Sequence, residues 1–386
     1  MGVYVRLIGI CIFLAVAINF SFIYNPRVHK DLFYHHHVFG APNIGKNEHT
    51  TATSKLALQG LWSNRAVSKA LQASRLYSEC QGKERFLVLM YSAIPSDEET
   101  SINQTAEKCS AFPVWSETAE LYGDRPIVIG METCEAYRNV LKGRRPLIRW
   151  AGLQNSGTNA LKRTLSKNLP GVSVKRLNSQ YMDKHVPLKY WYNNTRFNDE
   201  NQRYYLSVII VRDPYRWANS MCKTPYNAKW EREEGHCPNL LHNGGVLGGG
   251  STPITVSNAP GALFAHFATN HTSMMHLWSD WNKEYYDATF PHLIVRLEDL
   301  LFHPEQTLEY VANCTGTTRS EPHRYDLEAA KKHGNPADYI FGLKKYGSGQ
   351  GRYGGLTRQE FIWAGKEALD PTLMKVFGYS NGPGPA

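Results

Sequence analysis

The chain lacks several features that would assign it to a common class of enzyme. It contains no G-x-x-x-x-G-K-[ST] motif, so the lysine and hydroxyl that a P-loop kinase uses for phosphate and Mg²⁺ lack their usual places. It contains no Asp-x-Asp motif, which a metal-dependent glycosyltransferase normally carries. No internal repeat is evident, and lysine and arginine never form a long run, which argues against a nucleic acid partner.

The composition is that of a folded, basic protein. The 386 residues are 42% hydrophobic and 12% aromatic, which is enough to bury a large core in one large or two small domains. The formal net charge is +9. Such a charge favours an anionic partner, either a highly charged small ligand or an acidic polymer, with a merely solvated basic surface as the alternative.

Long apolar runs are also scarce, and the main one lies at the N-terminus. The segment from Leu7 to Tyr24 carries no charge and is long enough for a membrane-crossing helix, which needs roughly 17–25 residues. It is either a signal-anchor or a signal peptide cleaved after Ala15-Val16-Ala17. Cleavage there would leave a further apolar stretch, so the sequence favours an uncleaved anchor at residues 7–24 behind a cytoplasmic tail of residues 1–6.

Cysteine is sparse, with 7 in the chain, but its distribution is informative. All but one lie after the apolar run, at Cys80, Cys109, Cys134, Cys222, Cys237 and Cys314. Sequons of the form N-x-[ST] also follow that run, at Asn103, Asn193, Asn270 and Asn313. An even number of cysteines together with sequons predicts a luminal, oxidising environment with disulfides. These cysteines allow many pairings, and we choose Cys222 with Cys237 as one of them.

The pattern of the chain changes near Arg85. Residues 25–84 are predicted to be a luminal stem with no assignable fold. From there to residue 379, short runs rich in β-forming residues alternate with helical stretches. These runs are 86–92, 126–130, 146–152, 205–211 and 292–297. Apolar strands that alternate with helices predict a three-layer α/β domain with a central parallel sheet over residues 85–379, followed by a tail at 380–386.

The most informative segment is WAGLQNSGTNALKRTL, residues 150–165. A short apolar run leads into a Ser156-Gly157-Thr158 turn and then into a basic helix. Such a turn directs backbone N–H groups at one point, where the helix dipole adds positive potential. The segment therefore predicts a phosphate-binding loop, and the alternative is a turn without such a role.

A second motif follows the most hydrophobic predicted strand, in SVIIVRDPYRWANSM. Arg212 comes at the carboxyl end of that strand, Asp213-Pro214 breaks it, and a helix begins that carries Ser220. Ligands of parallel α/β sheets bind at this end, and the fork of an arginine suits phosphate oxygens. The alternative is an Arg–Asp pair that only ties the loop.

Together these motifs resemble the sulfotransferases that use 3′-phosphoadenosine 5′-phosphosulfate, PAPS, as donor. NSGTN at 155–159 is similar to the loop that wraps the 5′-phosphosulfate in that family, and Arg212 with Ser220 has the spacing of its 3′-phosphate site. Segments 295–311, 349–357 and 373–379 resemble further parts of the family. The resemblance covers roughly residues 145–379.

The resemblance implies a P-loop-like sulfotransferase fold and the transfer of a sulfuryl group without a required metal ion. The residues implied to bind PAPS are Asn155, Ser156, Gly157, Thr158, Asn159, Arg212, Ser220 and Arg352. Loop N–H groups and the Ser156 and Thr158 hydroxyls would hold the 5′-phosphate, while the arginines and Ser220 would hold the 3′-phosphate. By the same resemblance, His185 in YMDKHVPLKYW would remove the proton of the acceptor hydroxyl, with His236 and His242 as rivals.

Asn155 departs from the family, in which many members have lysine at this position. Asparagine supplies no charge, so we expect another cation to meet the negative charge that builds on the leaving phosphate. Lys162, one turn into the helix, is assigned to the catalytic residues for this role, and Arg149 is the alternative.

The acceptor is expected to be a carbohydrate hydroxyl, ahead of protein tyrosine and small alcohols. The resemblance and the anchor imply a single-pass type II protein of the Golgi membrane with a luminal catalytic domain. Aromatic residues that could stack on sugars are Tyr190, Trp191, Tyr192, Trp217, Trp230 and Trp278. The glycine-rich segment 222–253 is a candidate acceptor lid. The alternatives to this function are a P-loop-type kinase or other nucleotide-binding enzyme, and a non-catalytic PAP(S)-binding membrane protein.

Overall fold

The structure is a computed structural model that describes residues 80–93, 109–174, 184–192, 203–233, 235–257, 267–326 and 339–381. The chain divides into two compact units, one formed by Met1–Gln81 and Thr100–Ser110, the other by Gly82–Glu99 and Ala111–Ala386. The anchor predicted at 7–24 and most of the stem predicted at 25–84 lie outside the described residues. Within the described ranges, no helix has the length and apolar character needed to cross a membrane.

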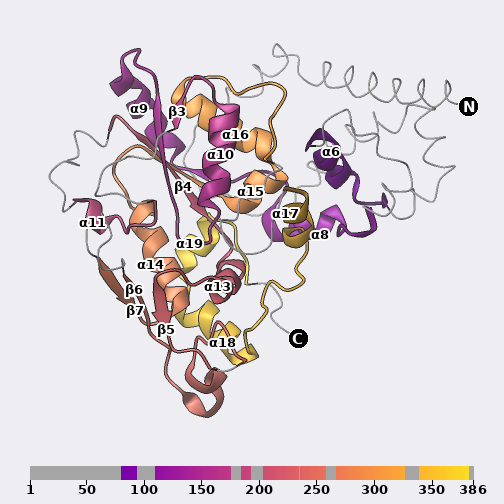
Figure 1. The fold of residues 1–386 in the computed structure, drawn as a ribbon, viewed down its shortest axis with the longest axis vertical. Coiled ribbons are helices and arrows are strands. Elements are labelled where there is room, and N and C mark those ends of the chain that lie inside the picture. The colour runs from indigo at the N-terminus through magenta and orange to yellow at the C-terminus, as the bar shows by residue number, and fades with distance from the viewer. Residues whose placement is uncertain are drawn as a thin grey trace, which may run out of the picture. The chain divides into compact units, whose positions relative to one another are not determined.

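The second unit is built on a mixed sheet of five strands (Figure 1). They are β1 (Val128–Ile129), β2 (Leu147–Ala151), β3 (Ser173–Val174), β4 (Leu206–Val211) and β8 (His292–Arg296), in the order β1-β8-β4-β2-β3. β8, β4, β2 and β3 run parallel, whereas β1 pairs with β8 in the antiparallel direction. The prediction of a parallel sheet is therefore wrong at this edge, because an apolar run as short as β1 carries no signal of its direction.

Helices cover both faces of this sheet (Figure 1). Those packed on one face are α9 (Cys134–Leu141), α10 (Thr158–Asn168) and α16 (Pro304–Thr315). Those packed on the other are α13 (Pro214–Lys223), α14 (Met274–Tyr286) and α19 (Pro371–Val376). The other helices and helical turns of the described residues are α6 (Glu84–Ala93), α8 (Trp115–Tyr122), η1 (Met131–Thr133), α11 (Lys189–Tyr192), η3 (His242–Gly248), α15 (Leu297–Phe302), α17 (Tyr339–Tyr346), α18 (Arg358–Trp363) and η4 (Ala364–Ala368). The α/β class predicted from the sequence is confirmed.

Alternation along the central strands explains the two layers of core. In β4, Val208 and Ile210 face the core beneath α10, while Ile209 and Val211 face the core beneath α13. Every residue of β4 is buried. A strand that is buried on both faces has a continuous apolar sequence, which is why this strand stands out in the chain.

The apolar run 86–92 is a helix and not the predicted strand. It lies within α6, where Phe86, Leu89, Met90 and Ala93 are buried while Val88 is exposed. Buried positions spaced by three and four residues have the periodicity of a helix face. The prediction is wrong because a short apolar run fits a buried strand and a buried helix alike.

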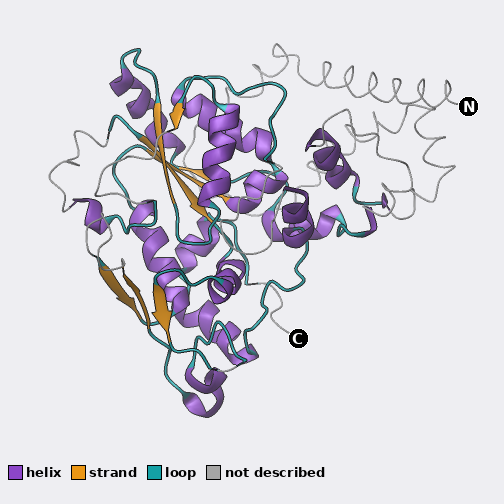
Figure 2. Cartoon of the chain, viewed as in Figure 1, coloured by secondary structure: helices purple, strands orange, loops and turns teal. Residues whose placement is uncertain are grey.

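A smaller antiparallel sheet lies apart from the central one (Figure 2). Its strands are β5 (Ala228–Trp230), β6 (Ile254–Ser257) and β7 (Ala268–His271), in the order β5-β6-β7. The predicted lid segment 222–253 contributes β5 and η3, so it is only partly irregular.

Among the described residues, disulfides join three pairs of cysteines. The predicted Cys222–Cys237 bond is confirmed, with a Cα–Cα distance of 5.9 Å. The other pairs are Cys80 with Cys109 in the first unit, and Cys134 with Cys314 in the second. Disulfides of this kind are compatible with a secreted or luminal protein.

Candidate functional site

The loop between β2 and α10 is a tight turn held by its own backbone. The N–H and hydroxyl groups of Ser156 both donate to the carbonyl oxygen of Leu153, over 3.2 and 2.6 Å. Asn155 and Gly157 have φ angles of 63° and 96°, in the left-handed region. Asparagine and glycine tolerate this conformation better than other residues, so both residue types suit the turn.

Both conformation and close neighbouring side chains favour glycine at position 157. A Cβ atom there would lie 2.8 Å from Leu297 Cδ1 and 3.4 Å from Ile210 Cδ1. Gly157 is also the N-cap of α10, and it has no side chain to satisfy the N–H groups of the first turn. The N-terminus of α10 is therefore an uncapped helix end, where N–H groups and the helix dipole favour an anion.

The side chain of Asn155 ties this loop to the end of α13. Its Nδ2 donates to the carbonyl oxygen of Thr224 over 2.7 Å and lies 3.2 Å from Met221 Sδ. From α13 itself, Trp217 Nε1 donates to the carbonyl oxygen of Gln154 over 2.7 Å. Asn155 thus contributes a structural contact, where a lysine would contribute a charge.

The second predicted motif lies beside the first. β4 and β2 are adjacent parallel strands, so Arg212, which follows β4, lies at the same edge of the sheet as the β2–α10 loop. Arg212 Nη1 donates to the carbonyl oxygen of Asn155 over 2.7 Å, and Nη2 donates to the Tyr346 hydroxyl over 2.8 Å. The structure therefore brings Arg212 together with the predicted phosphate loop.

Asp213 and Arg352 form a buried ion pair at the start of α13. Asp213 caps this helix by accepting the N–H groups of Tyr215 and Arg216 over 3.0 and 3.1 Å. Its other oxygen accepts from Arg352 Nε over 2.7 Å, and Arg352 is 0% exposed. Arg352 also donates from Nη2 to the carbonyl oxygen of Ser380. Arg352, implied as a 3′-phosphate ligand, thus has the contacts of an anchor that holds its loop and the C-terminal segment.

Ser220 lies farther along α13 and is half-buried. Its neighbour Asn219 donates from Nδ2 to the carbonyl oxygens of Gly351 and Arg352, over 3.3 and 3.0 Å. In the described part of the chain, no hydrogen bond joins the Ser220 hydroxyl to Arg212 or Arg352. Ser220 therefore belongs to the same helix as the motif but not to its hydrogen-bond network.

Burial and neighbouring charge shift the acidity of groups beneath these motifs. Burial, followed by the Asp213 carboxylate, raises the pKa of Glu298, whose Oε1 accepts the backbone N–H of Asp213 over 3.2 Å. Burial alone would lower the pKa of Arg352, but the Asp213 carboxylate raises it, and the net shift is upward. Arg352 is therefore cationic, and the start of α13 holds it together with Arg212 and Arg216, all buried.

His185 and Lys184 lie against the start of the β2–α10 loop. His185 Nδ1 bonds to the carbonyl oxygen of Gly152 over 2.6 Å, and the N–H of Gly152 donates to the carbonyl oxygen of Lys184 over 3.0 Å. Lys184 Nζ donates to Asn159 Oδ1 over 2.6 Å, in the first turn of α10. Because a carbonyl oxygen only accepts, Nδ1 carries the ring proton and Nε2 is the basic nitrogen of the neutral ring. Both the predicted base and a cation therefore lie beside the loop.

The two cations expected to replace the missing lysine, Lys162 and Arg149, contact residues outside the β2–α10 loop. Lys162 is exposed, and its Nζ lies 5.5 Å from the centroid of the Trp150 ring. Arg149 is buried, donates from Nε to Ser207 Oγ over 2.5 Å, and lies 5.0 Å from the centroid of the Phe290 ring. These contacts are not with the β2–α10 loop, whereas the contact of Lys184 is with the first turn of α10.

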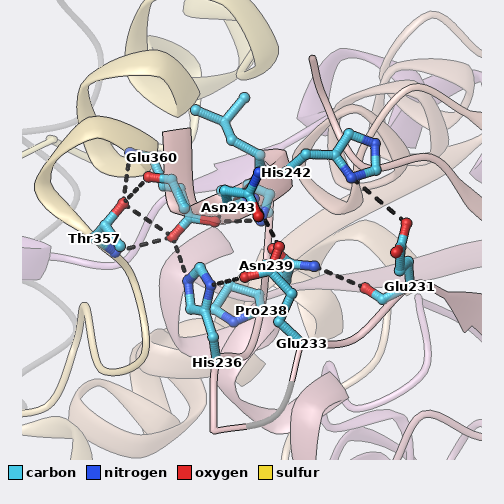
Figure 3. Close-up of polar contacts among 12 residues, drawn as sticks. Glu231, Glu233, His236, Pro238, Asn239, His242, Asn243, Thr357 and Glu360 are labelled. Atoms are coloured by element: carbon cyan, nitrogen blue, oxygen red, sulfur yellow. Dashed lines mark hydrogen bonds and ion pairs between the residues drawn. The ribbon is translucent and has the colours of Figure 1, made fainter. Parts of the chain in front are cut away.

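The rival bases His236 and His242 belong to a separate polar cluster (Figure 3). His236 Nε2 lies 2.8 Å from the buried carboxylate of Glu360, and its Nδ1 lies 3.5 Å from Glu233. His242 lies 3.5 Å from Glu231. Since both ring nitrogens of His236 face carboxylates, this ring links the 222–253 segment to α18 and has the contacts of a structural residue.

Two of the aromatic residues considered for sugar stacking are core residues. Trp217 is 0% exposed and Trp278 is 1% exposed. Full burial excludes stacking on a bound sugar, so the prediction is wrong for this pair. Tyr190 and Trp230 are half-buried, and the side chains of Trp191 and Tyr192 lie outside what the structure describes.

Lys184, Arg216 and Tyr346 also belong to this region, although the sequence did not single them out. Lys184 directly precedes the predicted base, and that position is the signal that could have identified it. Arg216 lies four residues after Arg212, in the first turn of the helix that Arg212 precedes. Tyr346 ends α17, and only the tertiary fold brings it to Arg212.

Comparison of the chain with protein-family models, with curated proteins and with solved structures finds no match. Within the described ranges, no group of three or more His, Cys, Asp or Glu side chains is arranged to hold a metal ion. The assignment of a function therefore rests on the residues of the site.

Proposed function

We propose that this chain is a PAPS-dependent sulfotransferase that moves a sulfuryl group to the hydroxyl of a carbohydrate acceptor. One observation supports this most strongly. Arg212 Nη1 donates to the carbonyl oxygen of Asn155 over 2.7 Å, so the two phosphate-binding motifs of the sequence meet in one place. A nucleotide with phosphate groups at both its 5′ and its 3′ position matches two neighbouring anion sites.

The 5′-phosphosulfate would bind at the uncapped N-terminus of α10. Its charge suits the N–H groups of the first turn, where Gly157 leaves room and Thr158 adds a hydroxyl. Ser156 shapes the turn through its bond to Leu153 and is 2% exposed, so in this proposal the backbone carries most of the binding. Arg212 and Ser220 would meet the 3′-phosphate, while Arg352 holds the loop that covers α13.

In the proposed reaction, the acceptor oxygen forms a bond to sulfur while the bond from sulfur to the bridging oxygen of the 5′-phosphate breaks. The electron pair of the broken bond goes to that phosphate oxygen, which leaves as part of adenosine 3′,5′-bisphosphate, PAP. The proton of the acceptor hydroxyl passes to Nε2 of His185, whose ring is oriented by its Nδ1 bond to Gly152.

Lys184 takes the role of the missing lysine in this proposal. Its ammonium group lies at the first turn of α10, where negative charge would build on the bridging oxygen as the sulfur–oxygen bond breaks. Lys162, whose ammonium lies over Trp150, has no comparable contact with that turn among those described. We therefore assign the stabilising charge to Lys184 first and to Lys162 second.

The proposal extends to a single-pass type II protein of the Golgi membrane with a luminal catalytic domain. The uncharged run at residues 7–24 and the disulfides of the described residues support this location. The net charge of +9 suits an acidic polymer, which is the reason to place carbohydrate ahead of other acceptors.

The test is incubation of the full-length protein with ³⁵S-labelled PAPS and a panel of glycans, tyrosine-containing peptides and small alcohols. We expect label on at least one acceptor with the wild-type protein. The variant His185→Asn should lower the rate of transfer by about 100-fold to 10,000-fold, because the proton acceptor is lost. The affinity of this variant for PAP, measured by calorimetry, should stay within about threefold of wild type, since the imidazole acts on the acceptor.

Two results would contradict the proposal. Measurable binding of PAP without transfer to any acceptor would favour the non-catalytic binding protein. Binding of ATP in preference to PAP would favour a kinase or another nucleotide-binding enzyme.

A further inference from the structure

Two arginines at the start of α13 share one tyrosine ring. The guanidinium carbon of Arg212 lies 5.0 Å from the centroid of the Tyr346 ring, and that of Arg216 lies 5.7 Å from it. Arg212 immediately precedes the N-cap of α13 and Arg216 lies in its first turn. Both cations are therefore next to the positive end of the same helix dipole.

Each of these guanidinium groups has one buried nitrogen atom, Nε, without a hydrogen-bond acceptor. Both residues are 4% exposed, and the Nε atoms of both have no hydrogen-bond partner among the described residues. The remaining nitrogens are engaged: those of Arg216 donate to the carbonyl oxygens of Ser348 and Gln350, and those of Arg212 to Asn155 and Tyr346. Buried N–H donors are nearly always satisfied, so this pair indicates an acceptor that the described residues do not supply.

The charged groups around Tyr346 also favour an anionic ligand. The Asp213 carboxylate is paired with Arg352 and already accepts two N–H groups of α13. Neither Arg212 nor Arg216 forms an ion pair with a carboxylate in the part of the chain that the structure describes. Lys345 Nζ lies 5.5 Å from the centroid of the same Tyr346 ring. Three cations around one ring favour a ligand group with more than one negative charge.

We propose that Arg216, together with Arg212, binds the 3′-phosphate of the donor nucleotide and makes the site selective for nucleotides that carry this group. The inference rests on the proposed function and adds a binding residue to it. A phosphomonoester carries about two negative charges at neutral pH and three acceptor oxygens, which are enough acceptors for both Nε–H groups. A nucleotide without the 3′-phosphate leaves both donors unmet, and the site discriminates against it for that reason.

The test compares two nucleotides on the full-length protein by calorimetry: PAP, which has the 3′-phosphate, and AMP, which lacks it. Arg216→Gln should weaken PAP binding at least tenfold and AMP binding less than twofold. Arg145→Gln is the matched control, because the Arg145 guanidinium likewise donates to backbone carbonyl oxygens, those of Pro170, Gly171 and Val172. The control should leave both affinities unchanged.

A second variant covers the case in which Arg216→Gln does not fold. Arg216→Lys keeps the positive charge but lacks the Nε donor, and it should weaken PAP binding more than AMP binding. An equal loss for both nucleotides would overturn the inference, because Arg216 would then serve only to hold the 348–350 loop. Unchanged PAP binding in the folded variants would overturn it as well. A wild-type protein that binds PAP no better than AMP would instead contradict the proposed function itself.

Discussion

Two strand-to-helix junctions lie next to each other at the carboxyl edge of the central sheet, and they are built in opposite ways. At the β2–α10 junction the helix begins at Gly157, which has no side chain to cap it. At the β4–α13 junction the Asp213 side chain accepts two N–H groups of the helix, and Arg352 pairs with that carboxylate. The N-terminus of α10 can therefore accept an external anion, whereas the N-terminus of α13 is already capped by the Asp213 carboxylate.

This difference shows how two neighbouring anion sites can use different chemistry. An uncapped helix offers its backbone N–H groups, which is suited to a phosphate that approaches the turn closely. A capped helix cannot offer them, so any anion beside it must be held by side chains, here Arg212 and Arg216. Changes that narrow the open helix end of the first junction should therefore act on nucleotide binding, and changes at the cap of the second should act on folding stability.

The largest effect is expected from Asp213→Asn. This change leaves the fully buried guanidinium of Arg352 without its carboxylate, so the free energy of unfolding should fall by about 3–5 kcal/mol. Chemical denaturation of the full-length protein measures it. The double variant Asp213→Asn with Arg352→Met should recover part of the loss, since it also removes the unpaired charge. A loss of less than about 1 kcal/mol in the single variant would show that this pair does not hold the junction.

The next effect concerns the cation at the open junction. Lys184→Met should lower kcat for sulfuryl transfer by about 100-fold, because the charge that builds on the leaving phosphate loses its partner. Lys162→Met removes the same charge from a neighbouring position on α10 and should lower kcat by about threefold or less. Steady-state kinetics of the two variants distinguishes the effect of a charge at position 184 from the effect of losing any lysine charge near α10. Equal losses of kcat in the two variants would contradict the assignment of the stabilising charge to Lys184 ahead of Lys162.

A tenfold effect is expected where the open helix end is made narrower. Gly157→Ala places a Cβ 2.8 Å from Leu297 Cδ1 at a φ of 96°, so the loop must shift and the affinity for PAP should fall about tenfold. Gly143→Ala is the control: its φ is 79° and an added Cβ meets no atom within 4 Å. This control should keep its affinity for PAP in calorimetry. If both variants lost affinity alike, general strain and not the shape of the loop would be responsible.

The smallest effect is expected from Asn155→Gly. Glycine keeps the left-handed conformation but loses the bond to the Thr224 carbonyl oxygen, so stability should fall by about 1 kcal/mol. Asn243→Gly, at a φ of 55° and an exposed site, is the control and should change stability very little. Thermal unfolding of both variants makes the comparison. A large fall in kcat for Asn155→Gly, with the free energy of unfolding unchanged, would mean that the Asn155 amide acts on the donor directly.

The parts of the fold that follow from local pattern were predictable from the sequence. The strand at 206–211 is apolar at every position except Ser207 because both faces are buried, and the turn at 155–158 is marked by its own residue types. The run 86–92 is a helix and not the predicted strand. Its helical periodicity lies in the pattern of buried and exposed residues, which depends on the packing of the rest of the unit. Local sequence thus predicts the central strands, which position the site, more reliably than it predicts the surrounding elements.

In the candidate site, too, the residues of local motifs were predictable from the sequence, whereas their long-range contacts were not. Arg212 follows a strand and is visible from the sequence, but the pairing of Arg352 with Asp213 joins residues 139 apart and depends on the whole fold. Likewise, the contact between Lys184 and Asn159 joins residues 25 apart, so no local spacing predicts it. Full burial of Trp217 and Trp278 is also a tertiary property, which composition alone does not distinguish from a sugar-binding surface.

The most direct measurement is a crystal structure of the full-length protein with PAP. The two-junction arrangement predicts the 5′-phosphate at the N–H groups of the first turn of α10 and the 3′-phosphate within hydrogen-bond distance of Arg212. PAP bound away from these junctions, or with neither phosphate in contact with them, would contradict it.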